Sequence, residues 1–203
     1  MRKGLDSSSK RTRQIIAQEA ARIIVGHGIR DYYHAKQKAA DRLGINAFGS
    51  LPGNKEIEKA IARQLRIFGG KSHEQLLRLM RNAALSAMTV LKSYSPRLVG
   101  PVLAGTADEN STINLHVFAD SPEIIALEIS DMGIKFKSYE RRLKTRHGQV
   151  VSYAGFEFSQ CNEIVQATTF PLIGIRQAPL SPINGKPMKR ADKNAVQELL
   201  NYL

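Results

Sequence analysis

Residues 96–120 read PRLVGPVLAGTADENSTINLHVFAD and mark the point at which the chain stops being helical. Ser95 and Pro96 break the helical spacing of apolar residues before them, because proline lacks the backbone N–H that a helix uses. Within the stretch, one short run is apolar, and a second run alternates apolar and polar side chains, which is typical of a half-buried strand. We therefore expect two neighbouring strands, Leu98–Leu103 and Ile113–Phe118, joined by a loop.

The chain beyond this stretch predicts a mixed α/β unit. Asp120 or Ser121, followed by Pro122 at the first helical position, predicts a helix that runs through Met132. The remaining expected elements are strands at 134–143, 149–158 and 162–170, a proline-rich loop at 171–187, and a last helix from 192 to 203. This order of elements is expected of a mixed sheet with flanking helices.

The chain before this stretch predicts helices. Apolar residues recur there at helical spacing, and glycines follow several of the periodic segments, as they do at helix ends. The expected helices cover about 10–26, 31–43, 54–68 and 72–94, after a disordered terminus at 1–9. The expected fold class is α+β, with a basic helical region at 1–94 packed on an α/β region at 95–203.

The charge is concentrated in the helical region. The whole chain of 203 residues has a formal net charge of +12. Residues 1–94 hold 18 Lys and Arg against 7 Asp and Glu, whereas residues 95–203 hold 12 against 11. A field of this kind concentrates polyanions. RNA, DNA, anionic lipid or an acidic protein is therefore an expected partner, and the alternative is a solvated basic surface without a partner.

The segment 54–68 divides its residues between two sides of the expected helix. At 100° per residue, the apolar side carries Ile57, Ile61, Leu65 and Phe68. The opposite side carries the four cations Lys55, Lys59, Arg63 and Arg66. We call these four residues the cationic stripe. The apolar side is expected to pack, and the stripe is expected to face solvent, where it is either a plain solvated surface or a nucleic-acid contact.

Residues 96–120 resemble the active-site strands of the polymerase-β-type nucleotidyltransferase fold. In that family a strand ends in a small pair such as Gly-Ser, and the next strand carries two acids that alternate with apolar residues. Gly105-Thr106 stands in the place of the small pair, and residues 111–115 stand in the place of the acidic strand. The whole chain also resembles uncharacterised proteobacterial proteins that share the PRLVG, GTA and LH-FAD runs.

The resemblance implies a nucleotide site and a catalytic site. The implied nucleotide-binding residues are Gly105, Thr106, Ser111, Thr112 and Asn114. The candidate catalytic residues are Asp120, His116, Glu157 and Glu163, where the two glutamates are alternatives for an acid from a later strand. The family's two acids correspond to Thr112 and Asn114, which carry no charge, whereas two-metal transfer needs carboxylates that hold cations about 3.5–4 Å apart. Mg²⁺ is the cofactor implied, and the uncharged pair predicts that ordinary transfer is slow or lost.

Other classes of function are disfavoured by the composition. Cys161 is the only cysteine, which excludes a disulfide framework and a zinc site built on several cysteines. The chain shows no dinucleotide fingerprint and no hydrolase elbow. Its apolar runs are too short for a membrane span or a signal peptide, so the expected location is the cytoplasm.

Two functional hypotheses follow. The first is a nucleotidyltransferase-like protein, catalytically degenerate, that binds nucleotide or nucleic acid. The alternative is a non-enzymatic module in which the helical half binds RNA, DNA or an acidic protein, with the sheet as scaffold.

Overall fold

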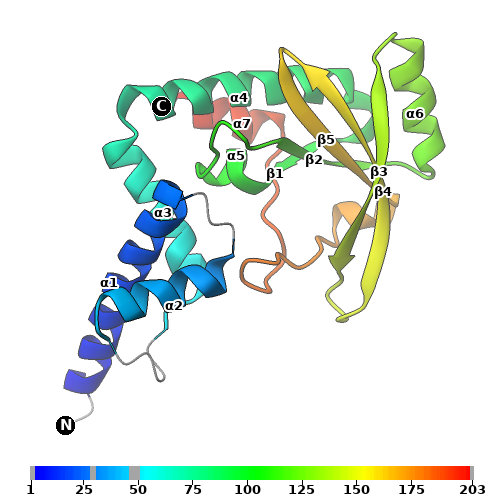
Figure 1. Ribbon diagram of the computed structural model, residues 1–203. Coiled ribbons are helices and arrows are strands. Elements are labelled where there is room, and N and C mark those ends of the chain that lie inside the picture. The colour runs from blue at the N-terminus through cyan, green and yellow to red at the C-terminus, as the bar shows by residue number, and fades with distance from the viewer. Residues whose placement is uncertain (1–2, 28–30, 46–50, 202–203) are drawn as a thin grey trace. The chain divides into compact units, whose positions relative to one another are not determined.

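The computed structural model describes residues 3–27, 31–45 and 51–201. The chain divides into two compact units, Met1–His73 and Glu74–Leu203 (Figure 1). The first is helical, and the second combines helices with a five-stranded mixed sheet. The expected α+β class is therefore confirmed.

Three helices build the first unit: α1 (Lys3–His27), α2 (Tyr32–Arg42) and α3 (Asn54–Phe68). Helix α1 contacts both α2 and α3. Their small and aliphatic side chains form one core, in which the members Ile16, Ala20, Ile23, Ala35, Ala39 and Ile57 are fully buried. Burial of a large aliphatic side chain contributes about 1.5–3 kcal/mol, so this core supplies the main stabilisation of a small unit.

The helix starts follow local hydrogen bonds. The Asp31 carboxylate accepts from the backbone N–H of Tyr33 at 2.8 Å, which caps the N-terminus of α2. The cap of α3 is Gly53, whose N–H donates to the Glu56 carboxylate at 2.7 Å. The Asn54 side chain, at the first position of the helix, accepts from Lys36 Nζ at 2.9 Å. Helix α1 begins at Lys3, earlier than expected, and residues 1–2 lie outside the described part of the chain.

The fourth expected helix, α4 (Gly70–Val90), belongs over most of its length to the second unit. Its buried side chains Leu77, Met80, Ala84, Ala87 and Met88 share a core with the sheet. The boundary between the units therefore lies at 73/74, whereas the break in helical period had suggested 94/95. The helical spacing of apolar residues ends where α4 ends, but α4 packs against the sheet, so the second unit begins near the start of this helix.

Five strands form the sheet: β1 (Arg97–Val99), β2 (Ile113–Phe118), β3 (Phe136–Lys144), β4 (Val150–Gln160) and β5 (Glu163–Phe170). Their spatial order is β1-β2-β5-β4-β3, with β2 and β5 parallel and the other pairs antiparallel. The expected neighbours are indeed paired, since Leu98 lies opposite Leu115.

The first expected strand is shorter than the apolar run suggested. It ends at Val99, and α5 (Gly100–Ala104) follows, so the strand expected to extend to Leu103 is wrong over its second half. Gly100 has φ +75°, and Pro101 occupies the first turn of α5. A left-handed glycine turns the chain, and proline is well suited to the first helical position. The apolar residues beyond Val99 are therefore buried from a helix.

One face of the sheet carries the core of the second unit. The alternating side chains of Ile113, Leu115, Val117, Val165, Ala167 and Phe158 lie on that face. The same core includes residues of α4, α6 (Pro122–Asp131) and α7 (Lys193–Asn201). The other face carries mostly polar side chains. The segment between β5 and α7 includes the short helix η2 (Leu172–Ile175) and contacts β2.

Candidate functional site

The sheet face opposite the core gathers several residues that the sequence had singled out. Strand residues alternate between faces, and the register places Asn114, Gln166 and Glu157 in one row across three strands. His116, Thr168, Gly155 and Tyr139 form the next row. We call this surface the polar face.

Arg141 of the edge strand β3 reaches across the polar face to β2 and β5. It donates from Nη1 to the Asn114 side-chain oxygen at 2.8 Å and from Nη2 to the Gln166 side-chain oxygen. Its guanidinium carbon lies 5.4 Å from the centre of the Tyr139 ring, within the range of a cation–π contact. The position that the resemblance gives to a metal-binding acid therefore holds an amide that binds a cation of the protein itself.

The residues present do not fit a two-metal centre. Glu157 lies on the polar face and accepts from Gln166 Nε2 at 2.7 Å, and Asn114 donates back to the Thr112 carbonyl at 3.0 Å. Among the described residues, no group of three or more His, Cys, Asp or Glu is placed to hold a metal ion. A guanidinium beside Asn114 also repels a divalent cation. The implied Mg²⁺ therefore has no suitable ligand set here.

His116 is buried on the polar face and binds Arg190. Its Nδ1 accepts from Arg190 Nε at 3.0 Å, and its ring lies 4.4 Å from that of Phe170. Burial, followed by the charges of Arg190 and Arg141, lowers the pKa of His116 well below its usual value. A neutral imidazole whose Nδ1 accepts carries its proton on Nε2, so this histidine is a hydrogen-bonding residue of the sheet.

Two of the four candidate catalytic residues lie away from this surface. Glu163 is two residues before Val165 in β5, so its strand position lies on the core face of the sheet. It pairs with Gln160 at the hairpin end of the strand. Asp120 is exposed and follows the carboxyl end of β2, roughly 20 Å along the chain from Asn114 at about 3.3 Å per residue. The structure thus brings together His116 and Glu157, but it leaves Glu163 and Asp120 apart from them.

The loop residues expected to bind nucleotide make hydrogen bonds within the loop or to α5. The backbone N–H groups of Gly105 and Thr106 both donate to the Pro101 carbonyl. Ser111 donates from Oγ to Asp108 at 2.7 Å and accepts from the Asp108 N–H at 2.9 Å. The loop is therefore closed on itself, and Gly105 serves as the left-handed end of α5, with φ +74°.

The cationic stripe of α3 is exposed along its whole length, as expected. The opposite side buries Ile57 and Ile61 completely or nearly so, and Leu65 packs at the edge of the core. Phe68, also expected to pack, is 74% exposed, because α3 ends there and the core lies further back along the helix. An exposed aromatic side chain therefore ends the helix that carries the stripe.

Two of the stripe residues line a groove between α1 and α3 with a volume of about 520 Å³. Helix α1 contributes the cations Lys10 and Arg22, and α3 contributes Lys59 and Arg63. Ile67 and Phe68 also line it, as does one acid, Glu56. We call it the cationic groove. It is a partly apolar trough whose charged side chains come from two helices.

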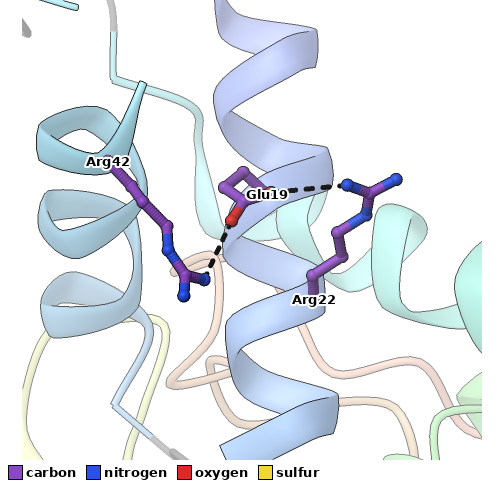
Figure 2. A network of polar contacts seen from close by, with 3 residues as sticks. All are labelled: Glu19, Arg22 and Arg42. Carbon is purple, nitrogen blue, oxygen red and sulfur yellow. Dashed lines mark hydrogen bonds and ion pairs between the residues drawn. The ribbon is translucent and has the colours of Figure 1, made fainter. Parts of the chain in front are cut away.

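Arg22, which lines the groove, also forms an ion pair with Glu19. Figure 2 shows Glu19 between two arginines, 3.7 Å from Arg22 and 3.2 Å from Arg42 of α2. The two arginine side chains are exposed, whereas that of Glu19 is only 15% exposed, and ion pairs at a surface contribute little stability. They leave one carboxylate shared between two guanidinium groups, so the surface stays positive. In the sequence, residues 1–73 hold 15 Lys and Arg against 6 Asp and Glu.

The sequence did not single out the three arginines Arg97, Arg141 and Arg190, or Arg22 of the groove. Arg141 belongs to a strand with polar alternation, and Arg190 follows a loop rich in proline. Neither position has a local signal of a site. Their roles follow from strand order, which places residues distant in the chain on one face.

No helix among the described residues is long and apolar enough to cross a membrane. Cys161 is an exposed free thiol in the turn between β4 and β5. No family model, no curated protein and no solved structure matches the chain.

Proposed function

We propose that the protein binds single-stranded nucleic acid along the cationic groove of its helical unit. The observation that carries this proposal is the convergence of Lys10 and Arg22 with Lys59 and Arg63 on one trough. Cations that follow a groove attract the phosphate backbone and release its counterions on binding. If the stripe were only the solvated face of α3, there would be no reason for α1 to contribute cations to the same groove, as it does.

The form of the nucleic acid follows from the apolar end of the groove. Ile67 and Phe68 line the groove and are 55% and 74% exposed. An exposed ring beside a cationic track offers a base a surface for stacking, which a paired base in a duplex does not use. The contacts from Lys and Arg are to phosphates, so binding is independent of base sequence.

Nucleotidyl transfer is a separate proposal that receives less support. The likeness of residues 96–120 to nucleotidyltransferase strands is supported by the pairing of β1 with β2 and by the place of Asn114 on the polar face. The chemistry of that face argues against a two-metal reaction, because amides and Arg141 stand where carboxylates are needed. We therefore propose a binding protein in which any related catalytic site is degenerate.

The test is a salt titration of binding, measured by fluorescence anisotropy with a short labelled single strand and the matching duplex. Wild type is compared with Lys59→Ser/Arg63→Ser, which removes two cations from the groove. The control is Lys55→Ser/Arg66→Ser, which removes two cations from the same helix outside the groove lining. The groove variant should lose more affinity, and its log–log salt slope should fall by about 0.7 per lost single-strand phosphate contact.

Three outcomes contradict the proposal. Tighter binding of the duplex would exclude the stacking role of Phe68. Equal losses in the two double variants would replace the groove by a diffuse charge effect. Absence of binding at low salt would remove nucleic acid and leave an acidic protein as the explanation of the charge, since an acidic surface is the other polyanion that such a field attracts.

A further inference from the structure

Three arginines of the polar face have neutral hydrogen-bond partners. Arg141 binds the amide oxygens of Asn114 and Gln166. Arg190 binds His116 and the carbonyls of Gly174 and Ile175, the former at 2.6 Å. The third, Arg97, binds the carbonyls of Ser95 and Pro96 at 3.2 and 3.1 Å, and its strand position lies directly opposite His116.

None of these three guanidinium groups is in an ion pair within the described part of the chain. Arg190 is partly buried, and its guanidinium lies 5.0 and 5.1 Å from the ring centres of Phe118 and Phe170. Burial and the neighbouring charge of Arg97 lower the pKa of Arg190 to about 10. The cations are thus close enough to repel each other, and removing such charges from water without an anion is costly.

The other charged groups on the polar face do not offset this charge. Glu157 accepts from Gln166, and its strand neighbour in the register is Lys137, another cation on the same face. Tyr139 contacts Thr168 through its hydroxyl, and the Tyr153 ring lies 4.4 Å from that of Phe170, so both add aromatic rings to this face. The face therefore carries four cationic groups and one carboxylate among the described residues, on a background of amides and aromatic rings.

Two buried donor nitrogens on this face also have no hydrogen-bond partner among the residues that the structure describes. They are His116 Nε2 and Arg190 Nη2. The His116 side chain is 1% exposed, and its Nδ1 is already used as an acceptor, so Nε2 carries the proton. An orphan buried N–H costs free energy unless an acceptor is supplied. The two side chains are in direct contact through His116 Nδ1 and Arg190 Nε, so both orphan donors belong to one pair of residues.

We propose that the polar face binds a small, multiply charged oxyanion of the phosphate type, with Arg97, Arg141 and Arg190 as its cationic partners. Guanidinium groups bind phosphate oxygens through pairs of parallel hydrogen bonds. The half-exposed Arg97 and Arg141 are the first contacts, and Arg190 and His116 supply the buried end. The neighbouring tyrosines place aromatic rings beside the anion, as a nucleotide would require. This site is independent of the cationic groove.

The experiment uses the full chain with pyrophosphate, triphosphate or ATP, all without divalent metal, and measures affinity by calorimetry at matched ionic strength. Arg97→Gln and Arg141→Gln should each weaken pyrophosphate binding by about tenfold or more, the effect of losing a charged hydrogen bond. Arg142→Gln is the control, because it removes the same charge from the next residue of β3, which is exposed and has the opposite strand parity.

The outcomes separate the proposal from a general charge effect. Triphosphate and ATP of equal affinity would assign a phosphate site, and tighter ATP would assign a nucleotide site. Both would support the proposal. The proposal would be overturned if pyrophosphate showed no binding beyond that of chloride at the same ionic strength. Equal losses of pyrophosphate affinity in Arg141→Gln and Arg142→Gln would also overturn it. Arg97→Gln keeps the test valid if Arg141→Gln fails to fold, because Arg97 bonds only to nearby carbonyls within the described structure.

Discussion

Arg190 donates from Nε to His116 Nδ1 at 3.0 Å, although the two residues are 74 positions apart in the chain. The contact links the segment that precedes α7 to the middle of β2. The same guanidinium holds the carbonyls of Gly174 and Ile175, so the chain beyond β5 is tied back to the polar face. The link requires a neutral histidine, because a protonated ring has no acceptor.

Acid should therefore weaken the fold through His116. Its pKa in the folded state is lowered, so the unfolded state binds the proton more readily. The associated stability is complete above about pH 6.5 and is lost as the pH falls towards the folded pKa, by at most about 1.4 kcal/mol per pH unit. Urea unfolding between about pH 7.5 and about pH 5 should show a smaller loss in His116→Gln, which keeps an acceptor but does not titrate. Parallel pH profiles would contradict this assignment.

Gly155 should not tolerate a side chain while Tyr139 lies over it. A Cβ at Gly155 would stand 2.6 Å from the Tyr139 hydroxyl oxygen, and that hydroxyl is 2.8 Å from Thr168 Oγ1. We expect Gly155→Ala to lower the free energy of unfolding by about 1–3 kcal/mol, as overpacking does. The matched test is Gly155→Ala in a Tyr139→Ala background, where denaturant unfolding should show a much smaller cost. Additive losses would mean that the ring is not the obstacle.

Phe68 should contribute to single-strand binding through its ring. Phe68→Ala is expected to weaken binding of the short single strand by about 1–3 kcal/mol, the usual contribution of one stacked base. Phe68→Tyr should retain most of it, since the ring is kept. Because Phe68 is 74% exposed, the free energy of unfolding should change little, within about 0.5 kcal/mol. Anisotropy titrations beside denaturant curves check both points, and equal weakening by Ala and Tyr would exclude stacking.

Nucleotidyl transfer should be undetectable under ordinary conditions. Asn114 and Gln166 hold Arg141 where two-metal chemistry needs carboxylates. Each labelled nucleoside triphosphate is incubated with Mg²⁺ or Mn²⁺ and a panel of RNA and protein acceptors. Transfer that disappears in Glu157→Gln would show that this carboxylate works with metal after all, whereas Asp120→Asn serves as a control on an exposed acid distant from Asn114.

Local patterns predicted the elements better than their ends and their partners. The alternation in 113–118 identified β2, and the helical spacing identified α3 with its exposed stripe. The apolar run up to Leu103 was assigned wholly to a strand, because apolar content alone does not distinguish a strand from a short buried helix. Phe68 was assigned to the core by its angle on the helix, but angle says nothing about how far along the helix the core extends.

The candidate site was predicted in part. His116 was expected on one face with Asn114, because residues two apart in a strand share a face, and the register places it there. Glu157 lies on the same face. The choice between Glu157 and Glu163 could not be made from spacing, because it depends on the register between β4 and β5. Gly105 and Thr106 were expected to bind nucleotide, but both of their backbone N–H groups donate to the Pro101 carbonyl of the short helix α5.

The sequence by itself determined the α+β class, the concentration of charge in the helical part and the two-sided character of α3. These properties depend on composition and on periods of 3.6 and 2 residues, which are local. The tertiary structure decided which distant residues meet: Asn114 binds Arg141, and His116 binds Arg190. It also brought Lys10 and Lys59 to the lining of one groove. Strand order and helix pairing are set by burial of the whole core, and no local pattern encodes which strands become neighbours.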